Sequence, residues 1–252
     1  MLTEIIAILK KMEPITLDEM KNIRLMDRID SKFVAPVDLL PQLLEDMKPY
    51  FKVQIHNNTR IAPYTTQYLD TPDKDMFVMH QNGKLNRQKI RIRSYVDSKI
   101  SFLEVKNKNN KGRTKKIRVP IEVSHVDSID DLNTNHQFLK ENSLFESLKL
   151  EPSLANTFNR ITLVNNRKTE RITIDLNLSF YNYKTGLKKD LEEIMILELK
   201  QDGWQHSDFR DILMKLRIKK TPFSKYCMGL VFTDPGIKYN RFKGRCSRIN
   251  KL

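Results

Sequence analysis

Arginine and lysine residues recur at every second position in several segments of this sequence. Lys89, Arg91 and Arg93 alternate with Ile90 and Ile92. In an extended strand, side chains two residues apart lie on the same face, about 7 Å from each other. Guanidinium groups bind phosphate oxygens through paired hydrogen bonds. Side chains at this spacing can bind phosphates of one chain, so the pattern predicts a surface that binds an extended polyanion.

Five further segments also place cations on one strand face, with apolar residues on the other. These cations are Lys106, Lys108, Lys116, Arg118, Arg160, Arg171 and Lys200. For one segment alone, a solvated outer face of a sheet is the preferred interpretation. Six agreeing segments, in which Thr is scarce, favour a common basic surface. If the sheet closes with this face inward, the like charges repel one another unless an anion fills the space.

The segments that carry these cations are predicted to be strands. Apolar and polar residues alternate over 59–70, 88–96, 100–108, 115–123, 157–164, 170–178 and 193–200. Helices are predicted near the start of the chain, over 36–47, 129–140 and 207–216, and after Pro222. Strands joined by hairpins, with helices at both ends and in the middle, predict an antiparallel α+β barrel.

Composition indicates a globular protein with a large excess of positive charge. The 252 residues include 45 Lys or Arg and 31 Asp or Glu, which gives a net charge of +14. We therefore expect a polyanionic partner: nucleic acid, an anionic membrane surface or a phosphate-rich small molecule. No apolar run approaches the roughly 18 residues that a membrane-spanning helix needs. Two cysteines, Cys227 and Cys246, are too few for a disulfide framework, which suits a reducing cytoplasmic location.

The chain contains no Pro-, Gly- or Ser-rich linker and no internal repeat. We predict one domain over residues 1–237, followed by a basic segment over 238–252. That segment is rich in Lys and Arg and contains no acidic residue. We expect it to be partly disordered, or held in place by Tyr239 and Phe242.

Other reactive residues give weaker signals. The five histidines show no metal-ligand spacing, and Walker A, GxGxxG and HExxH motifs and a Ser-His pair are missing. We expect Glu104 and Glu122 to balance the cations. For Asp175 we expect pairing with Arg171, two positions earlier on the same face, in preference to a metal. Cys227, in an apolar helical context, is expected to be buried and inert.

Nine short segments follow one another in an order that suggests a family. They are RIDSKF (28–33), YLDT (68–71), KIRIRSY (89–95), FLEVKNK (102–108), GRTKKIRV (112–119), LEPSLANTFNR (150–160), ERITIDLNL (170–178), ILELK (196–200) and FSKYCMG (223–229). Each is a weak signal alone, but nine in order are fairly specific. Together they resemble the VTC-type polyphosphate polymerase domain of the CYTH-like, or triphosphate tunnel metalloenzyme, superfamily.

The resemblance implies a closed antiparallel β-tunnel with helices packed at its ends and outside. It implies that the tunnel binds ATP and polyphosphate, and that the γ-phosphate of ATP is transferred to the growing chain. It implies a divalent metal, Mn²⁺ or Mg²⁺, on Glu198. The cations that it assigns to phosphate binding are Lys32, Arg91, Arg93, Lys106, Lys116, Arg118, Arg160, Arg171, Lys200 and Lys225.

Two other functions stay open at this point. One is a triphosphate hydrolase on the same tunnel. The superfamily's ExExK strand reads RIDSKF here, with one acid, Asp30, and polymerase-type members share that loss. The other is a non-catalytic binder of polyphosphate or nucleic acid. Nucleic-acid surfaces interleave aromatic residues with cations, whereas the basic strand faces here carry few aromatic residues, with Tyr95 and Phe102 the main candidates. We therefore expect no specific nucleic acid, while a protein partner that handles the product is compatible with the sequence.

Overall fold

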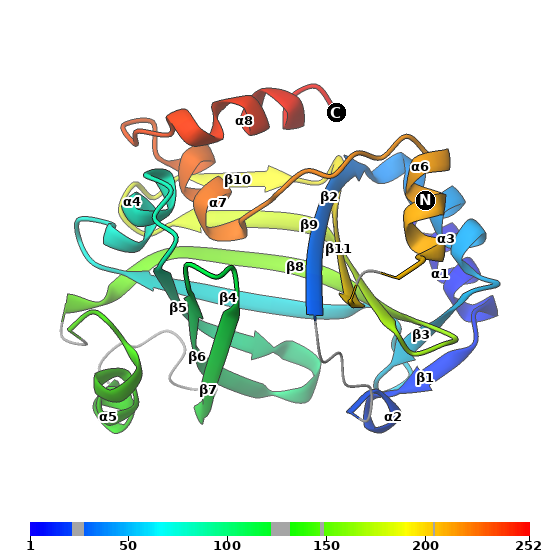
Figure 1. The fold of residues 1–252 in the computed structure, drawn as a ribbon, viewed down its shortest axis with the longest axis horizontal. Coiled ribbons are helices and arrows are strands. Elements are labelled where there is room, and N and C mark those ends of the chain that lie inside the picture. The colour runs from blue at the N-terminus through cyan, green and yellow to red at the C-terminus, as the bar shows by residue number, and fades with distance from the viewer. Residues whose placement is uncertain (22–27, 122–131, 147–148, 204) are drawn as a thin grey trace.

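An eleven-stranded sheet forms most of the molecule (Figure 1). The computed structural model describes residues 1–21, 28–121, 132–146, 149–203 and 205–252. The strands are β1 (Pro14–Thr16), β2 (Arg28–Pro36), β3 (Phe51–Ile55), β4 (Ala62–Asp70), β5 (Arg87–Tyr95), β6 (Ile100–Lys108), β7 (Thr114–Ile121), β8 (Glu151–Asn165), β9 (Glu170–Asn182), β10 (Lys188–Leu191) and β11 (Ile194–Asp202). The helices are α1 (Leu2–Lys11), α2 (Leu17–Lys21), η1 (Val37–Leu39), α3 (Leu40–Met47), α4 (Asp75–Gln81), η2 (Val96–Ser98), α5 (Leu132–Asn142), α6 (Asp208–Lys215), α7 (Lys225–Thr233), η6 (Asn240–Phe242) and α8 (Lys243–Ile249).

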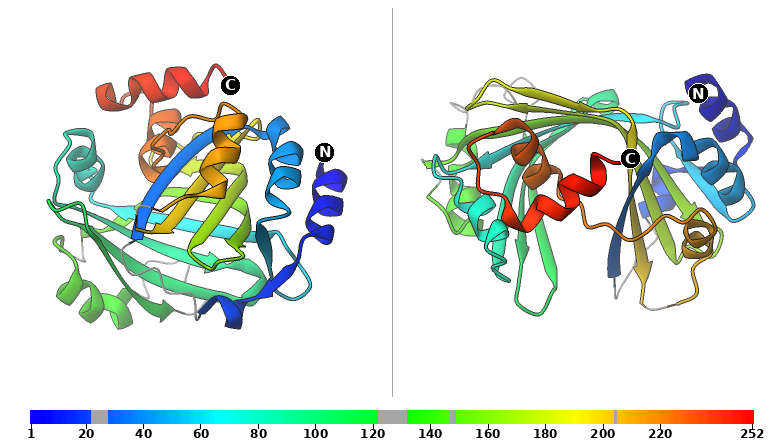
Figure 2. Two further views of the ribbon diagram at one scale, coloured as in Figure 1. Left: turned by 45° about the vertical axis from the view of Figure 1, so that its right-hand side comes forward. Right: turned by 90° about the horizontal axis from the view of Figure 1, so that it is seen from above.

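The main path through the sheet runs β2–β11–β9–β8–β4–β5–β6–β7, and every neighbouring pair on it is antiparallel. This confirms the predicted antiparallel α+β architecture. Off the path, β1 pairs with β3 in parallel, β3 also joins β8, and β10 joins β9. The sheet curves strongly, so that strands β5, β6 and β7 lie on one side of the molecule and the paired strands β2 and β11 lie on the other (Figure 2).

The sheet is not closed into the expected tunnel. Within the described residues, the two end strands, β2 and β7, do not pair with each other. Closing the sheet would bring Lys116 and Arg118 of β7 toward Lys32 of β2. These like charges oppose such an approach when no anion lies between them.

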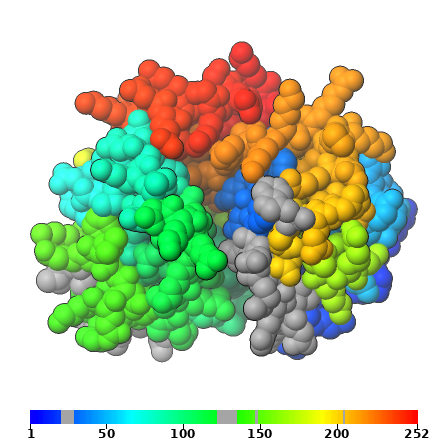
Figure 3. All heavy atoms as spheres, viewed as in Figure 1, coloured from blue at the N-terminus to red at the C-terminus, as the bar shows by residue number. Residues whose placement is uncertain are grey.

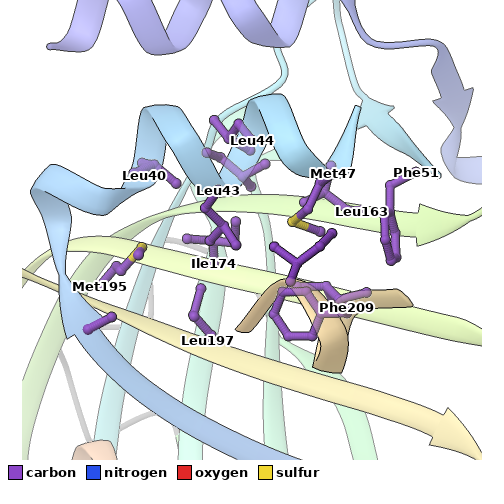
Figure 4. Packing of buried hydrophobic residues seen from close by; sticks show 14 of the residues in the cluster. Leu40, Leu43, Leu44, Met47, Phe51, Leu163, Ile174, Met195, Leu197 and Phe209 are labelled. Carbon is purple, nitrogen blue, oxygen red and sulfur yellow. The ribbon is translucent and has the colours of Figure 1, made fainter. Parts of the chain in front are cut away.

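The outer face of the curved sheet packs against helices. Helix α3 buries a stripe at helical spacing, and the outward side chains of β9 and β11 pack against it (Figure 4). The stripe consists of Leu40, Leu43, Leu44 and Met47. Burial of each such side chain contributes roughly 1.5–3 kcal/mol. Because strand side chains alternate, this packing commits the intervening residues of β9 and β11 to the inner face.

A second cluster fixes the C-terminal helices to the sheet. Helix α7 lies so close to β8 and β9 that a Cβ at Gly229 would come within 2.4 Å of Leu154. Residues 238–252 form η6 and α8, and the Phe242 side chain is fully buried. Tyr239 packs against the same cluster. Of the two expectations for this segment, the structure shows attachment through Tyr239 and Phe242.

The end of β4 is tied to two helices by one buried carboxylate. Asp70 accepts hydrogen bonds from the backbone N–H groups of Thr71, Met76 and Phe77, at 2.8, 3.0 and 3.1 Å, and from the Tyr226 hydroxyl. Asp70→Ala leaves these buried donors unsatisfied. We expect it to lower the free energy of unfolding by about 3 kcal/mol, measured by chemical denaturation.

The matched control is Asp73→Ala, because Asp73 lies on the exposed turn just beyond β4. We expect this variant to unfold within about 0.5 kcal/mol of the parent. Equal unfolding midpoints for the two variants would show that the Asp70 network does not hold β4, α4 and α7 together.

Most predicted elements are present, with shifted ends. The predicted strand over 157–164 extends to Glu151–Asn165, and the predicted helix over 129–140 is observed as Leu132–Asn142, with residues 129–131 outside the described part. Glu122 also lies outside the described residues. No described helix has the length and apolar character needed to cross a membrane.

Candidate functional site

A pocket of about 790 Å³ lies on the inner face of the curved sheet. All ten cations predicted to bind phosphate line it, and so does Glu198, the predicted metal ligand. Lys89 is an eleventh cation, whereas four carboxylates, Asp30, Asp97, Asp175 and Glu198, share the lining. Among the residues that the structure describes, this wall is therefore strongly positive.

The Glu104 carboxylate forms ion pairs with two of these cations. Its carboxylate lies 2.6 Å from Arg91 Nη2 and 2.8 Å from Lys116 Nζ. The three residues sit on neighbouring strands β5, β6 and β7, where Arg91 faces Glu104 directly. Burial alone would raise the pKa of Glu104. The charges of Arg91 and Lys116 outweigh this effect and lower the pKa to about 2. This confirms that Glu104 balances the cations.

Asp175 forms a second unit of the same kind. It binds Arg160 through two hydrogen bonds, of 2.6 and 2.8 Å, and it also pairs with Lys225 at the start of α7. The expected pairing with Arg171 is wrong. Arg160 lies directly opposite Asp175 on β8, whereas Arg171 is four residues away along β9. Directly opposed side chains come closer than side chains four residues apart on one strand face.

Glu198 completes the third unit. Its two carboxylate oxygens lie 3.7 Å from Lys32 Nζ and 3.5 Å from Lys200 Nζ. Burial alone would raise the pKa of Glu198, but the charges of Lys32 and Lys200 lower it well below its usual value. Thr173 faces Glu198 on the neighbouring strand, and its buried hydroxyl makes no hydrogen bond to a described residue.

Two further cations are held by neutral partners. Arg93 Nε donates to Thr66 Oγ1 at 3.2 Å, and Lys89 Nζ donates to Ser224 Oγ at 2.7 Å. Lys89 was not among the residues that the family resemblance assigned. It stands two positions before Arg91 on the same strand face, so the period-two pattern alone identifies it.

Two other assigned cations, Arg118 and Arg171, also line the pocket. Arg118, on the edge strand β7, lies over the Phe102 ring with its guanidinium carbon 4.3 Å from the ring centroid. Arg171 donates from Nη2 to the carbonyl oxygen of Met20 in α2, at 3.2 Å. An aromatic ring and a backbone carbonyl oxygen therefore help to position these two side chains.

Burial and neighbouring positive charges markedly lower the pKa of two lysines in the pocket. Burial lowers the pKa of Lys106 to about 7, and the charges of Lys32 and Arg91 lower it as well. Burial and the charge of Arg160 lower the pKa of Lys225 to about 8, although Asp175 opposes this effect. A bound anion would favour the protonated form of both lysines.

The lowered pKa values of Lys106 and Lys225 predict how tripolyphosphate binding depends on pH. Tripolyphosphate binding should take up protons near pH 7–8, because the anion raises the lowered pKa of Lys106 and Lys225. The ratio of the parent's affinity for tripolyphosphate to that of Lys106→Met should therefore fall as pH rises through this range. Calorimetry in two buffers of different ionisation enthalpy measures the proton uptake.

The comparison with Lys106→Met at each pH cancels the titration of the ligand itself. Without ligand, this variant should unfold at a higher temperature at pH 7, since it removes a cation from a repulsive, buried environment. An unchanged proton uptake in Lys106→Met would show that Lys106 does not face the anion.

The residues around Glu198 fit a divalent metal shared with a ligand. Among the described residues, no group of three or more His, Cys, Asp or Glu could enclose an ion. Mg²⁺, however, is commonly held by one or two carboxylates together with substrate phosphates and water. The ionised Glu198 and the unsatisfied hydroxyl of Thr173 supply hard oxygen ligands of this kind.

An open, curved antiparallel sheet around a pocket of Lys and Arg suits a polyanionic ligand. The family model of the VTC domain matches residues 27–233, and the chain belongs to this family. The resemblance drawn from the nine segments is thereby confirmed. A search of curated proteins finds no match to the sequence.

Solved structures with a similar fold share little sequence with this chain. HpAC1 from Hippeastrum, described as a candidate adenylyl cyclase with a dominant triphosphatase activity, is 14% identical with a TM-score of 0.47, and the match covers 84% of this chain and all of that chain. The PH1819 protein from Pyrococcus horikoshii is 15% identical with a TM-score of 0.44, and the match covers 81% of this chain and 98% of that chain.

Proposed function

We propose that this chain is a metal-dependent polyphosphate polymerase, which transfers the γ-phosphoryl group of ATP to a growing polyphosphate chain. The observation that carries the proposal is the pocket, where eleven cations and four carboxylates converge inside a VTC-family fold. Such an enclosed excess of positive charge is stabilised by a ligand with several negative charges. A triphosphate and a polyphosphate chain both have that character.

The transfer itself requires no nucleophile from the protein. An anionic oxygen at the end of the acceptor chain forms a bond to the γ-phosphorus of ATP. The bond between that phosphorus and the β–γ bridging oxygen breaks, and ADP leaves with the electron pair. The protein contributes in-line positioning and neutralisation of the charge on the oxygens.

The three carboxylate-centred units suit this role. Asp175 holds Arg160 through two of its N–H groups, and Glu104 holds Arg91 in a similar way. A guanidinium fixed along one edge loses less conformational freedom when its other N–H groups bind phosphate. We propose that the ten assigned cations bind phosphate and that Lys89 joins them.

Glu198 is the residue proposed to hold the metal, with Thr173 beside it. When bound, Mn²⁺ or Mg²⁺ would add positive charge next to the phosphoryl oxygens. Lys32 and Lys200, which lie against Glu198 in the structure, keep this carboxylate ionised. They would also be available to phosphate oxygens on either side.

The carboxylates favour transfer over hydrolysis. A general base that activates water works best with a pKa near the operating pH. The neighbouring cations lower the pKa of Glu104, Asp175 and Glu198. These three groups are therefore weak bases, whereas an acceptor phosphate needs no base.

The test is an assay of the purified protein with ATP and Mn²⁺ or Mg²⁺, with and without a short polyphosphate primer. ADP, free phosphate and long chains are resolved separately. ADP together with long chains supports the polymerase. ADP with an equal amount of free phosphate would assign a triphosphate hydrolase. Neither product, with tripolyphosphate still bound, would indicate a binding protein.

A cytoplasmic location and a partner that handles the product stay predictions.

A further inference from the structure

Three arginines gather outside the pocket, where the C-terminal segment packs on α4. They are Arg87 of β5, Arg241 of η6 and Arg245 of α8. The anchor of this segment is Phe242, which is fully buried with its ring 5.6 Å from the His80 ring of α4. Arg245 lies over the Phe242 ring, with its guanidinium carbon 5.4 Å from the centroid. The packing of η6 and α8 therefore fixes where these arginines lie.

The other two arginines are also held in place. Arg241 lies against the backbone of Gly83, so closely that a Cβ there would come within 2.4 Å of Arg241 Nη1. Arg87 Nη1 donates to the carbonyl oxygen of Lys84, at 2.8 Å. Gly83 and Lys84 follow α4 directly, so both contacts converge on one short loop.

No carboxylate of the described residues forms an ion pair with these three guanidinium groups. Among the carboxylates that the structure describes, none lies within 4.0 Å of Arg87, Arg241 or Arg245. Burial and the charge of Arg241 lower the pKa of both Arg87 and Arg245. In the pocket, by contrast, six cations have carboxylate partners. The cluster is therefore a strongly positive surface without internal compensation.

The cluster continues the cation row of the pocket. Arg87 stands two residues before Lys89 on the same face of β5, and Lys89 lines the pocket. On β6, Lys108 lies opposite Arg87, and Lys106 lies opposite Lys89. A step of two residues along a strand is about 7 Å. Figure 3 shows that α4 and residues 238–252 adjoin on one face of the molecule.

We propose that Arg87, Arg241 and Arg245 form a second polyanion site, which binds the part of a polyphosphate chain that extends beyond the pocket. This inference rests on the proposed function. Residues 238–252 lie outside the part of the chain that the family model matches, 27–233. Two of the three arginines therefore lie beyond the matched region, and we expect the site to contact only chains long enough to extend past the pocket.

Two other polyanions fit the surface less well. Single-stranded nucleic acid uses aromatic platforms for stacking, but Phe242 is buried and Tyr239 packs against the core cluster. A membrane surface requires a continuous exposed apolar face beside the cations. The exposed apolar side chains near the cluster, Val78, Leu85 and Leu252, are single residues on three separate segments, and Cys246 and Ile249 of α8 are buried.

The test compares a short and a long probe, tripolyphosphate and a long linear polyphosphate. In the double variant Arg241→Gln/Arg245→Gln, we expect affinity for the long probe to fall about tenfold, with a shallower salt dependence. Affinity for tripolyphosphate should not change. The matched control, Lys10→Gln/Lys11→Gln, removes two exposed cations from α1, far from the cluster (Figure 1). It should keep both affinities.

Arg87→Gln serves as a second variant, and thermal unfolding confirms that each variant is folded. Unchanged affinity for long polyphosphate, or an equal loss in the Lys10/Lys11 control, would overturn the proposal. Single-stranded DNA is a further probe. If the parent binds it as tightly as polyphosphate, and the double variant loses the same affinity for it, the surface is assigned to nucleic acid instead. If the parent makes no polymer but the length-dependent loss occurs, the polymerase proposal fails and the second site stands. If polymer forms and the loss is missing, only the second site fails.

Discussion

Arg91→Ala is expected to weaken tripolyphosphate binding about a hundredfold, and Arg93→Ala to have an effect of similar size. Both side chains line the pocket from the same face of β5, about 7 Å apart, so that both can bind one extended polyanion. Each charge-assisted hydrogen bond to phosphate contributes about 1.5–3 kcal/mol, and a guanidinium can form two of them. The measurement is the Kd for tripolyphosphate by calorimetry, without added metal.

The design must separate lost binding from lost folding. Arg91→Ala leaves the buried Glu104 with Lys116 as its remaining partner, which costs stability. The double variant Arg91→Ala/Glu104→Gln removes that uncompensated charge and should still bind weakly. Arg113→Ala, on the exposed turn between β6 and β7, is the control and should bind normally. Normal binding in both arginine variants would refute the pocket as the phosphate site.

Glu198→Gln is expected to reduce metal-dependent turnover at least about a hundredfold while anion binding persists. The substitution keeps the shape of the side chain and removes the carboxylate charge that a divalent cation requires. It also removes a negative charge that faces Lys32 and Lys200. Tripolyphosphate should therefore bind the variant at least as tightly as the parent when metal is absent.

The readouts are turnover as a function of Mn²⁺ concentration and the metal-free Kd for tripolyphosphate. The control is Asp30→Asn, because Asp30 is a more exposed carboxylate that also lines the pocket. It should keep most of the turnover. Full activity in Glu198→Gln would mean that the metal is bound elsewhere, and a large loss in Asp30→Asn alone would transfer the role to that residue.

Much of the inner face was predictable from the strand patterns. Alternation placed Thr173 and Asp175 opposite Ile172 and Ile174, and the structure shows this division between pocket and core. The prediction succeeded because the two-residue repeat is a local property of extended backbone. The roles of the assigned residues in phosphate and metal binding stay predictions that the experiments above test.

The elements that were missed have weak local patterns. Strand β2 begins RIDSKF, in which polar residues interrupt the apolar ones, so it was found only by its resemblance to a family motif. Strand β3 has five residues and β10 has four, too few for a period to stand out. These strands form because longer neighbours offer them hydrogen-bond partners, which is a tertiary effect.

The sequence by itself determined that this protein carries rows of cations on strand faces, with apolar residues on the opposite faces. Only the tertiary structure decided which charges meet. Lys225 reaches Asp175 from 50 residues away, and Arg160 meets Asp175 through the register between β8 and β9. The open edge between β2 and β7 was likewise decided at this level. Side-chain faces follow from local backbone geometry, whereas pairing across strands depends on register and on the packing of distant helices.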